Sequence, residues 1–247
     1  MIADPTFWAL GIAAAVAVGL GKGGMPVAAN LGVPLLALAV PPLTATALLA
    51  PVFVISDLFG LWAYWRDFDR RVVAIIAAGA TLGVGFGWAT ASLVPDALVE
   101  GLVGLIGLVF GLRLLFMRGN LPQRRPAQVG PGLFWGGVTG FTSFVAHAGG
   151  PPWQVYVLPL GLSKTRFAGT NTVSFAYINA IKLAAYATLG QLSLANLKVA
   201  AVLSLPAALA VLAGVWLVKI LPQRLFFTLV TWALVMVSLR LLWQAAT

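Results

Sequence analysis

Long apolar runs separated by short polar stretches dominate this chain. Six runs reach the roughly 20 residues that a helix needs to cross a bilayer at about 1.5 Å per residue. The other four are shorter and form two pairs, each of which precedes three long runs. The runs fall at about 6–20, 26–40, 43–65, 71–94, 97–117, 131–147, 151–162, 166–189, 195–219 and 222–245, and the first, second, sixth and seventh are the short ones. The pattern predicts six long transmembrane helices and two pairs of short helices.

Each short pair is interrupted by two adjacent glycines. The first break is Gly23-Gly24, with Pro26 just beyond it, and the second is Gly149-Gly150, with two prolines directly after it. In transporters, helix breaks at corresponding places in two repeats point to the substrate site. The sequence therefore predicts that each short pair is a broken or re-entrant helix hinged at its glycines.

The two halves of the chain follow one order, which is short, break, short, long, long, long. In this register, residues 57–64 align with residues 179–186. Each half holds an odd number of crossings whether or not its short pair spans, so the second half is expected to be inverted. We expect a first repeat at 1–117, a cytoplasmic linker at 118–130 and a second repeat at 131–247, all within one integral-membrane domain. The predicted fold is thus an all-α polytopic membrane protein made of two inverted repeats, each with a short broken or re-entrant helix pair and three long transmembrane helices.

The composition excludes several other classes of protein. Hydrophobic residues make up 61% of the 247 positions and charged residues 9%, whereas a soluble domain carries about 25% charged residues. A transmembrane barrel is disfavoured because its strands alternate apolar and polar residues over roughly 10 positions, whereas this chain has long unbroken apolar runs. With no cysteine, one histidine and six acidic residues, we expect no metal site, no cofactor, no catalytic residue and no enzyme activity. The chain has no basic run that would favour nucleic acid as a partner.

Basic residues gather at the ends of the apolar runs. The loops at 66–71 and 118–125 each carry three arginines, and such clusters stay on the cytoplasmic side of a membrane. Counting crossings from these loops predicts that both termini lie outside the cytoplasm. The net charge of +9 is explained first by these basic residues of the cytoplasmic loops. The alternative is that it attracts anionic substrates.

The glycine breaks suggest how an anion could be held. A helix that begins at a break exposes its first N–H groups and the positive end of its dipole, and glycine lets the backbone approach a ligand closely. We therefore expect Gly23, Gly24, Gly149 and Gly150 to form an anion cradle of peptide donors. The alternative is that these residues only permit close helix crossing, as small residues do in membranes.

Two ionisable residues lie deep within predicted spans. Lys182 lies well inside the run at 166–189, with Asn179 one turn before it and Asn171 on roughly the same helix face. A charge at such depth usually faces a cavity or a partner, which favours substrate binding by these three residues over snorkelling of the lysine to the interface. Asp57 occupies the corresponding face of the first half. It could pair with Lys182, or it could take up a proton and couple transport to H⁺, and coupling to Na⁺ stays open as well.

Four more polar residues border the breaks. Lys22 either contacts the anion or serves as a positive residue at a cytoplasmic helix end. His147 would be a pH-sensitive donor to an anion or a packing residue. Asn30 and Gln154 lie one turn into the second short helices, where they could supply neutral hydrogen bonds.

Several stretches resemble the sulfite exporter TauE/SafE family. They are the glycine-rich break with Pro26 and Pro34, residues 140–152 and residues 164–171, and the resemblance extends from about Trp8 to Leu241. It implies a multi-pass carrier in the bacterial inner membrane for sulfite, sulfonates such as sulfoacetate, or related sulfur-containing anions. Both termini would then be periplasmic.

The sequence thus predicts a secondary transporter that works by alternating access, with the anion bound near the midplane. An anion channel of the same architecture and a carrier for another small organic or inorganic anion are the alternatives. The expected partners are a small anionic substrate and the lipid bilayer, and H⁺ or Na⁺ coupling and a homodimer are open possibilities.

Overall fold

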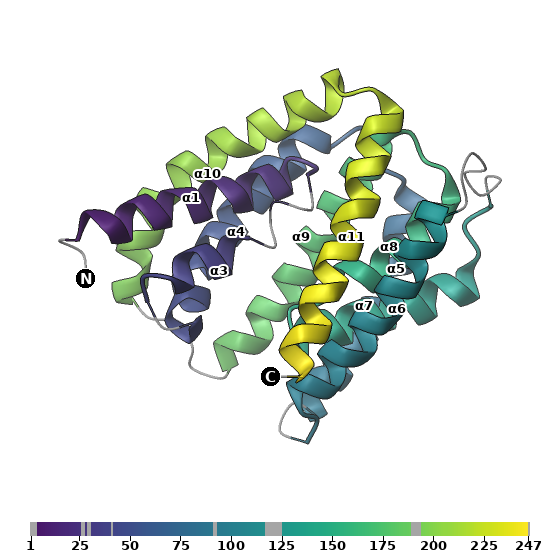
Figure 1. The fold of residues 1–247 in the computed structure, drawn as a ribbon, viewed down its shortest axis with the longest axis horizontal. Helices are drawn as coiled ribbons and strands as arrows, with labels where there is room; N and C mark the ends of the chain where they lie inside the picture. Colours follow the sequence, from purple (N-terminus) through teal and green to yellow (C-terminus); the bar gives the residue numbers. More distant parts are fainter. Residues whose placement is uncertain are drawn as a thin grey trace. The chain divides into compact units, whose positions relative to one another are not determined.

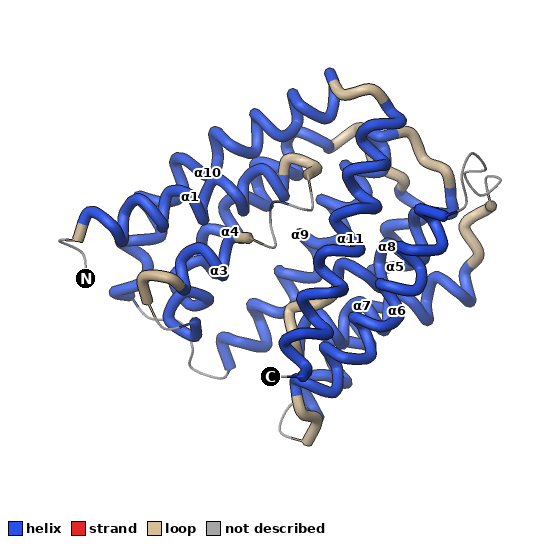
Figure 2. The backbone as a smooth tube through the Cα atoms, viewed as in Figure 1, coloured by secondary structure: helices blue, strands red, loops and turns tan. Residues whose placement is uncertain are grey.

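The computed structural model describes residues 4–25, 28, 31–40, 42–90, 93–116, 125–188 and 194–246. Within these ranges every regular element is helical, and turns join the helices (Figure 1, Figure 2). This confirms the predicted all-α class. The elements are α1 (Pro5–Lys22), α3 (Gly32–Ala37), α4 (Pro42–Tyr64), α5 (Arg70–Thr90), α6 (Asp96–Phe116), α7 (Val129–Val145), α8 (Gly150–Val157), η1 (Leu158–Leu160), α9 (Lys164–Thr188), α10 (Leu194–Ile220) and α11 (Gln223–Ala246).

Five helical segments in the described part of the chain are long and apolar enough to cross a membrane. They are Pro5–Lys22, Arg70–Thr90, Ala97–Phe116, Lys198–Ile220 and Gln223–Ala246. Four of them match runs that the sequence predicts as full crossings. The two remaining long runs form α4, with 23 residues, and α9, with 25, neither of which is among the five, although α4 contains a shorter apolar segment.

The length of α1 corrects one expectation. The first run was expected to be too short to span, yet α1 has 18 residues and meets the length and hydropathy of a span. The reason lies at its two ends. The side chain of Asp4 accepts a hydrogen bond from the Thr6 N–H and caps the helix, while Pro5 occupies the first turn. At the other end the helix continues through two glycines to Lys22.

One compact unit combines Met1–Asp67 with Asn171–Leu221. In it, α1 packs along α10, and α4 packs on α10 as well. The α1–α10 crossing is close because glycines of α1 face the backbone of α10. A Cβ atom at Gly19 would collide with the carbonyl oxygen of Ala207, and one at Gly23 would collide with that of Val211. Small residues at such a crossing are what membrane helices use to approach each other.

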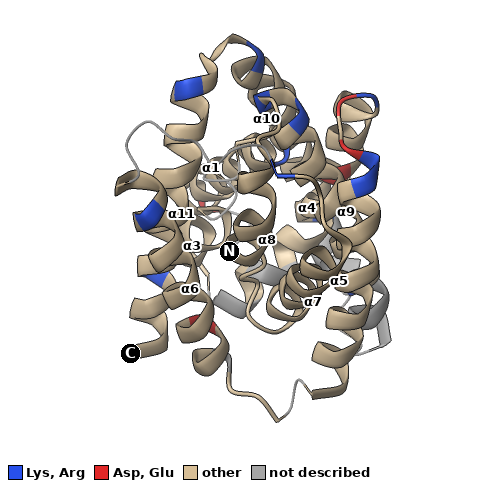
Figure 3. Ribbon diagram, turned by 90° about the vertical axis from the view of Figure 1, so that its right-hand side faces the viewer, with Lys and Arg blue, Asp and Glu red and all other residues tan. Residues whose placement is uncertain are grey.

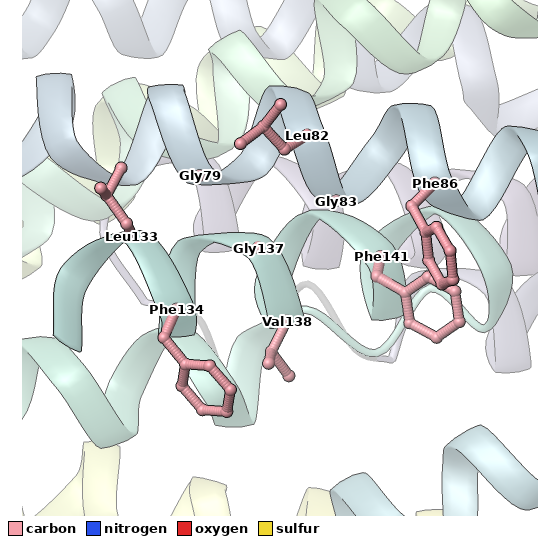
Figure 4. Close-up of a pocket in the computed structure, with 9 residues that line it drawn as sticks. All are labelled: Gly79, Leu82, Gly83, Phe86, Leu133, Phe134, Gly137, Val138 and Phe141. Carbon is pink, nitrogen blue, oxygen red and sulfur yellow. The ribbon is translucent and has the colours of Figure 1, made fainter. Parts of the chain in front are cut away.

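The second compact unit combines Phe68–Thr170 with Pro222–Thr247. Here α5 lies against α7, and α6 lies against α11. Figure 4 shows α5 and α7 side by side, with Gly79 and Gly83 next to Gly137. A Cβ atom at Gly83 would collide with the carbonyl oxygen of Gly137. The two units each draw on both halves of the chain, so they do not coincide with the predicted repeats, whose boundaries at 117 and 131 stay a prediction.

The side chains that face outward suit lipid. Large apolar residues such as Leu38, Leu82 and Phe116 are 75%, 74% and 80% exposed. Most of the ribbon in Figure 3 belongs to neither charge class. A surface this apolar needs a hydrocarbon environment rather than water. The helices and their surface together identify a multi-pass membrane protein.

Candidate functional site

The first glycine break is a helix C-terminus closed by its own backbone. The N–H of Gly23 bonds to the Gly19 carbonyl oxygen at 2.8 Å, that of Gly24 to Gly21 at 3.1 Å and that of Met25 to Leu20 at 3.1 Å. The last two bonds are those of a Schellman motif. Gly24 has φ 103°, a value that favours glycine because it has no side chain to clash. The predicted break at Gly23-Gly24 is therefore confirmed as the end of α1.

The last carbonyl groups of α1 are held by two neighbouring helices. The Thr172 hydroxyl of α9 donates to the Lys22 carbonyl oxygen at 2.9 Å, and the Tyr64 hydroxyl of α4 donates to that of Gly23 at 2.7 Å. The backbone donors of this turn already bond within α1, so in this structure the break directs carbonyl oxygens, rather than N–H groups, at its neighbours. A direct role of Gly23 and Gly24 in anion binding stays a prediction.

Three helices of the first unit bring four polar side chains together beside this break. Lys22 Nζ of α1 lies 2.6 Å from Asp57 Oδ1 of α4. Asn179 of α9 donates from Nδ2 to Asp57 Oδ2 at 2.7 Å. Lys182 follows Asn179 by one turn of α9 and is buried as well. We call Lys22, Asp57, Asn179 and Lys182 the charged cluster.

The charged cluster is buried. Lys22, Asp57 and Lys182 are 7%, 4% and 5% exposed, and Asn179 is half-buried. Burial of this degree disfavours the alternative in which Lys182 snorkels to an interface. Asp57 forms an ion pair with Lys22 of α1. The sequence weighed Lys182 as its partner, and that second pairing stays a prediction. The positions of Lys22 and Asp57 in the sequence give no signal for this pairing, because they lie on different helices with no fixed register between them.

Buried neutral groups accompany the charged cluster in the same unit. Asn171 and Ser174 lie on α9, and Ser56 precedes Asp57 on α4; all three are buried. Among the described residues, the hydroxyl oxygens of Ser56 and Ser174 have no hydrogen-bond partner. Buried hydroxyls without partners are uncommon and invite a ligand or water. Ser56 and Tyr64 were missed from the sequence, although both are polar positions in an otherwise apolar run.

The second glycine break joins α7 to α8 in the other unit. α7 ends at Val145, and His147 has φ 51° and is exposed. Gly149 is buried and caps α8, which begins at Gly150. The break predicted here is thus confirmed. The following two residues are prolines and have no N–H, so Gly150 is the one residue among the first three of α8 that can donate from its backbone.

Neutral polar side chains surround this second break. Gln154 on α8, Thr139 on α7 and Ser238 on α11 are buried, and within the described residues one side-chain oxygen of each has no hydrogen-bond partner. Ser238 lies close to the start of α8, since a Cβ atom at Gly107 would contact both its hydroxyl oxygen and Pro151. These side chains can donate to or accept from a ligand without adding charge.

The predicted site residues therefore fall into two groups. The first unit contains the following: Lys22, Gly23, Gly24, Asp57, Asn171, Asn179 and Lys182. The second unit contains the following: His147, Gly149, Gly150 and Gln154. Asn30 lies outside the described residues. Over the ranges that the structure describes, no group of three histidine, cysteine or acidic side chains could hold a metal ion.

A shallow groove along the α5–α7 crossing is a poor candidate for an anion site. It is lined by apolar side chains, among them Leu82, Phe86, Phe134 and Phe141 (Figure 4). A small anion gains nothing from such a lining, because no donor replaces its hydration. With this groove set aside, the polar residues around the first break and those around the second break are the candidates for substrate binding.

Replacing Tyr64 with phenylalanine is expected to weaken the closure of the first break. The Gly23 carbonyl oxygen would lose its donor while the ring stays in place. A hydrogen bond between membrane helices contributes about 0.6 kcal/mol on average, with a maximum near 1.7, so a small drop in Tm is expected. Thermal unfolding of purified Tyr64→Phe protein in detergent measures it, and an unchanged or higher Tm would show that the bond does not stabilise the break.

Comparison with known proteins identifies the family of this chain. The family model for the sulfite exporter TauE/SafE matches residues 7–243. No curated protein and no solved structure gives a significant match. The family match covers nearly all of the chain, including both glycine breaks, the charged cluster and all or most of each candidate span. The protein therefore belongs to the TauE/SafE sulfite exporter family, whose members are transporters rather than enzymes.

Proposed function

We propose that this protein is a secondary transporter that moves small sulfur-containing anions, such as sulfite and sulfonates including sulfoacetate, across the bacterial inner membrane by alternating access. The family match supplies the class of substrate. The single observation that carries the proposal is the charged cluster, in which two lysines and one aspartate are buried inside a membrane protein. Buried charges in membrane segments are costly and usually serve transport.

The charged cluster has the chemistry that an oxyanion needs. An ammonium group donates three hydrogen bonds and carries a full charge, and sulfite or sulfonate oxygens accept such bonds well. Lys22 and Lys182 supply the charge, while Asn171 and Asn179 supply amide groups beside it. The hydroxyls of Ser56 and Ser174, which have no partner among the described residues, would complete the coordination.

The second break, which lies in the other unit, is a further candidate for anion binding. Gly149 and Gly150 stand at the N-terminus of α8, and the positive end of a helix dipole favours an anion. Gln154 and His147 lie within the same short stretch of chain. We include Gly23, Gly24 and Asn30 in the substrate path because they belong to the first break, and we assign Asp57 to coupling with H⁺, with Na⁺ as the alternative ion.

Inverted repeats would explain how one site opens to either side. In the register that pairs the two halves, α1 corresponds to α7 and α10 corresponds to α5. The crossings α1–α10 and α5–α7 are alike in that glycines on one helix approach the backbone of the other. This likeness supports a duplication with inverted topology, and the arginine loops support periplasmic termini.

Uptake into proteoliposomes tests the function. Sulfite is expected to enter vesicles that contain the protein, and Lys182→Ala is expected to reduce the initial rate by about tenfold, which corresponds to about 1.4 kcal/mol. Lys198→Ala is the matched control because Lys198 is an exposed lysine on α10. Uptake that is absent would refute the function, and uptake that neither Lys182→Ala nor His147→Ala changes would refute the site.

Counterflow separates the carrier from the channel. A carrier that works by alternating access exchanges internal for external substrate and saturates, whereas an anion channel of the same architecture does neither. Vesicles preloaded with unlabelled sulfite are therefore expected to accumulate labelled sulfite transiently. A rate that rises linearly with concentration and shows no exchange would favour the channel.

A further inference from the structure

The charge of the buried site can be counted. Among the described residues, Lys22, Asp57 and Lys182 are the buried acidic or basic side chains. With both lysines protonated and Asp57 ionised, they leave a net charge of +1. Asp57 is counted as ionised in the state that binds substrate, because one of its oxygens is 2.6 Å from Lys22 Nζ and the other accepts from Asn179 at 2.7 Å. Contacts to an ammonium and to an amide N–H suit an ionised carboxylate.

We infer that Asp57 sets the charge number of the substrate, so that the site selects anions with one negative charge over anions with two. The inference rests on the proposed function and adds a specificity to it. Asp57 acts on the substrate through the field of the charged cluster and need not touch it. Hydrogensulfite and alkylsulfonates would be preferred to sulfite and sulfoacetate, which carry two charges.

The preference follows from electrostatics at short range. A singly charged anion brings the buried net charge to zero, whereas a doubly charged anion leaves −1 in a medium where unbalanced charge is poorly solvated. One unit of unbalanced charge about 6 Å away, at an effective dielectric constant of about 20, corresponds to a preference on the order of 10- to 100-fold.

Competition in the unaltered protein tests the preference directly. Uptake of labelled sulfite into proteoliposomes is measured against two pairs of inhibitors matched in size, which are methanesulfonate with sulfate and 2-hydroxyethanesulfonate with sulfoacetate. Within each pair, the singly charged anion is expected to inhibit at a concentration about tenfold lower. Equal or stronger inhibition by the doubly charged anion, or no inhibition by any singly charged anion, would overturn the inference while leaving the proposed transport of sulfite in place. Absence of sulfite uptake would remove both.

A pair of variants tests the role of Asp57. Asp57→Asn raises the net charge to +2 and is expected to reduce or reverse the preference within each pair by about tenfold. The double variant Lys22→Met with Asp57→Asn removes the ion pair but keeps +1 through Lys182, so it is expected to retain the preference. If Asp57→Asn shows the preference of the unaltered protein, Asp57 does not set it.

The ratio of the inhibition constants for singly and doubly charged anions also distinguishes charge selection from proton coupling. If Asp57 only coupled transport to H⁺, Asp57→Asn would abolish the dependence of uptake on a pH gradient and leave the ratio of the inhibition constants unchanged. Should Asp57→Asn fail to fold, the competition in the unaltered protein still decides whether the preference exists. In that case, loss of the preference in the double variant would contradict the charge count.

Discussion

Replacing Lys22 with methionine is expected to destabilise the protein by about 3–5 kcal/mol, because it leaves the buried carboxylate of Asp57 without its charged partner. Asp57 is 4% exposed and lies 2.6 Å from Lys22 Nζ. Methionine replaces most of the volume of the lysine, so the loss reports the charge rather than a cavity. For a chain of this length, the expected fall in Tm is roughly 6–20 °C. Thermal unfolding in detergent measures it.

Two further variants show whether the ion pair is the cause. Adding Asp57→Asn to Lys22→Met removes the unpaired carboxylate and is expected to recover most of the lost stability, since replacing both members of a buried pair is often nearly neutral. Lys198→Met, at an exposed position of α10, is expected to change Tm little. A double variant that is no more stable than Lys22→Met would show that the pair does not act as a unit.

Gly83→Ala is expected to destabilise the second unit by about 1–3 kcal/mol by overpacking. A Cβ atom at Gly83 would collide with the Gly137 carbonyl oxygen and would lie 2.8 Å from the backbone nitrogen of Phe141. Backbone atoms cannot move aside as the end of a flexible side chain can, so α5 and α7 would have to separate. Both helices present glycines at this crossing (Figure 4), so there are few side chains there that could move to make room for the added methyl group.

Gly85→Ala is the matched control on the same helix. A Cβ atom at Gly85 would meet nothing within 4 Å, so this variant is expected to leave Tm unchanged or to raise it slightly through better helix propensity. The difference in Tm between the two variants isolates the close approach from the general effect of replacing a glycine. Equal effects of the two substitutions would contradict the tight crossing.

Much of the site could be located from the sequence, but not its internal contacts. The breaks at Gly23-Gly24 and Gly149-Gly150 were predictable because glycine pairs followed by proline end helices locally. The depth of Lys182 in α9 followed from counting residues along an apolar run. The Schellman bonds that use the donors of the first break were not foreseen, because the residue types allow either a helix start or a helix end to face the site.

The hydropathy pattern by itself determined that this chain is an all-helical membrane protein, where most of its helices begin and end, and which polar residues lie at depth. These properties depend on neighbours within about 20 residues, which periodicity and length record. The tertiary structure alone decided that Lys22 is the ion-pair partner of Asp57, that Tyr64 and Thr172 hold the end of α1, and which glycines face backbone. The ion pair and the two hydrogen bonds join residues 35 to 150 positions apart in the chain. Their register is set by how side chains of different helices pack, which no local pattern encodes.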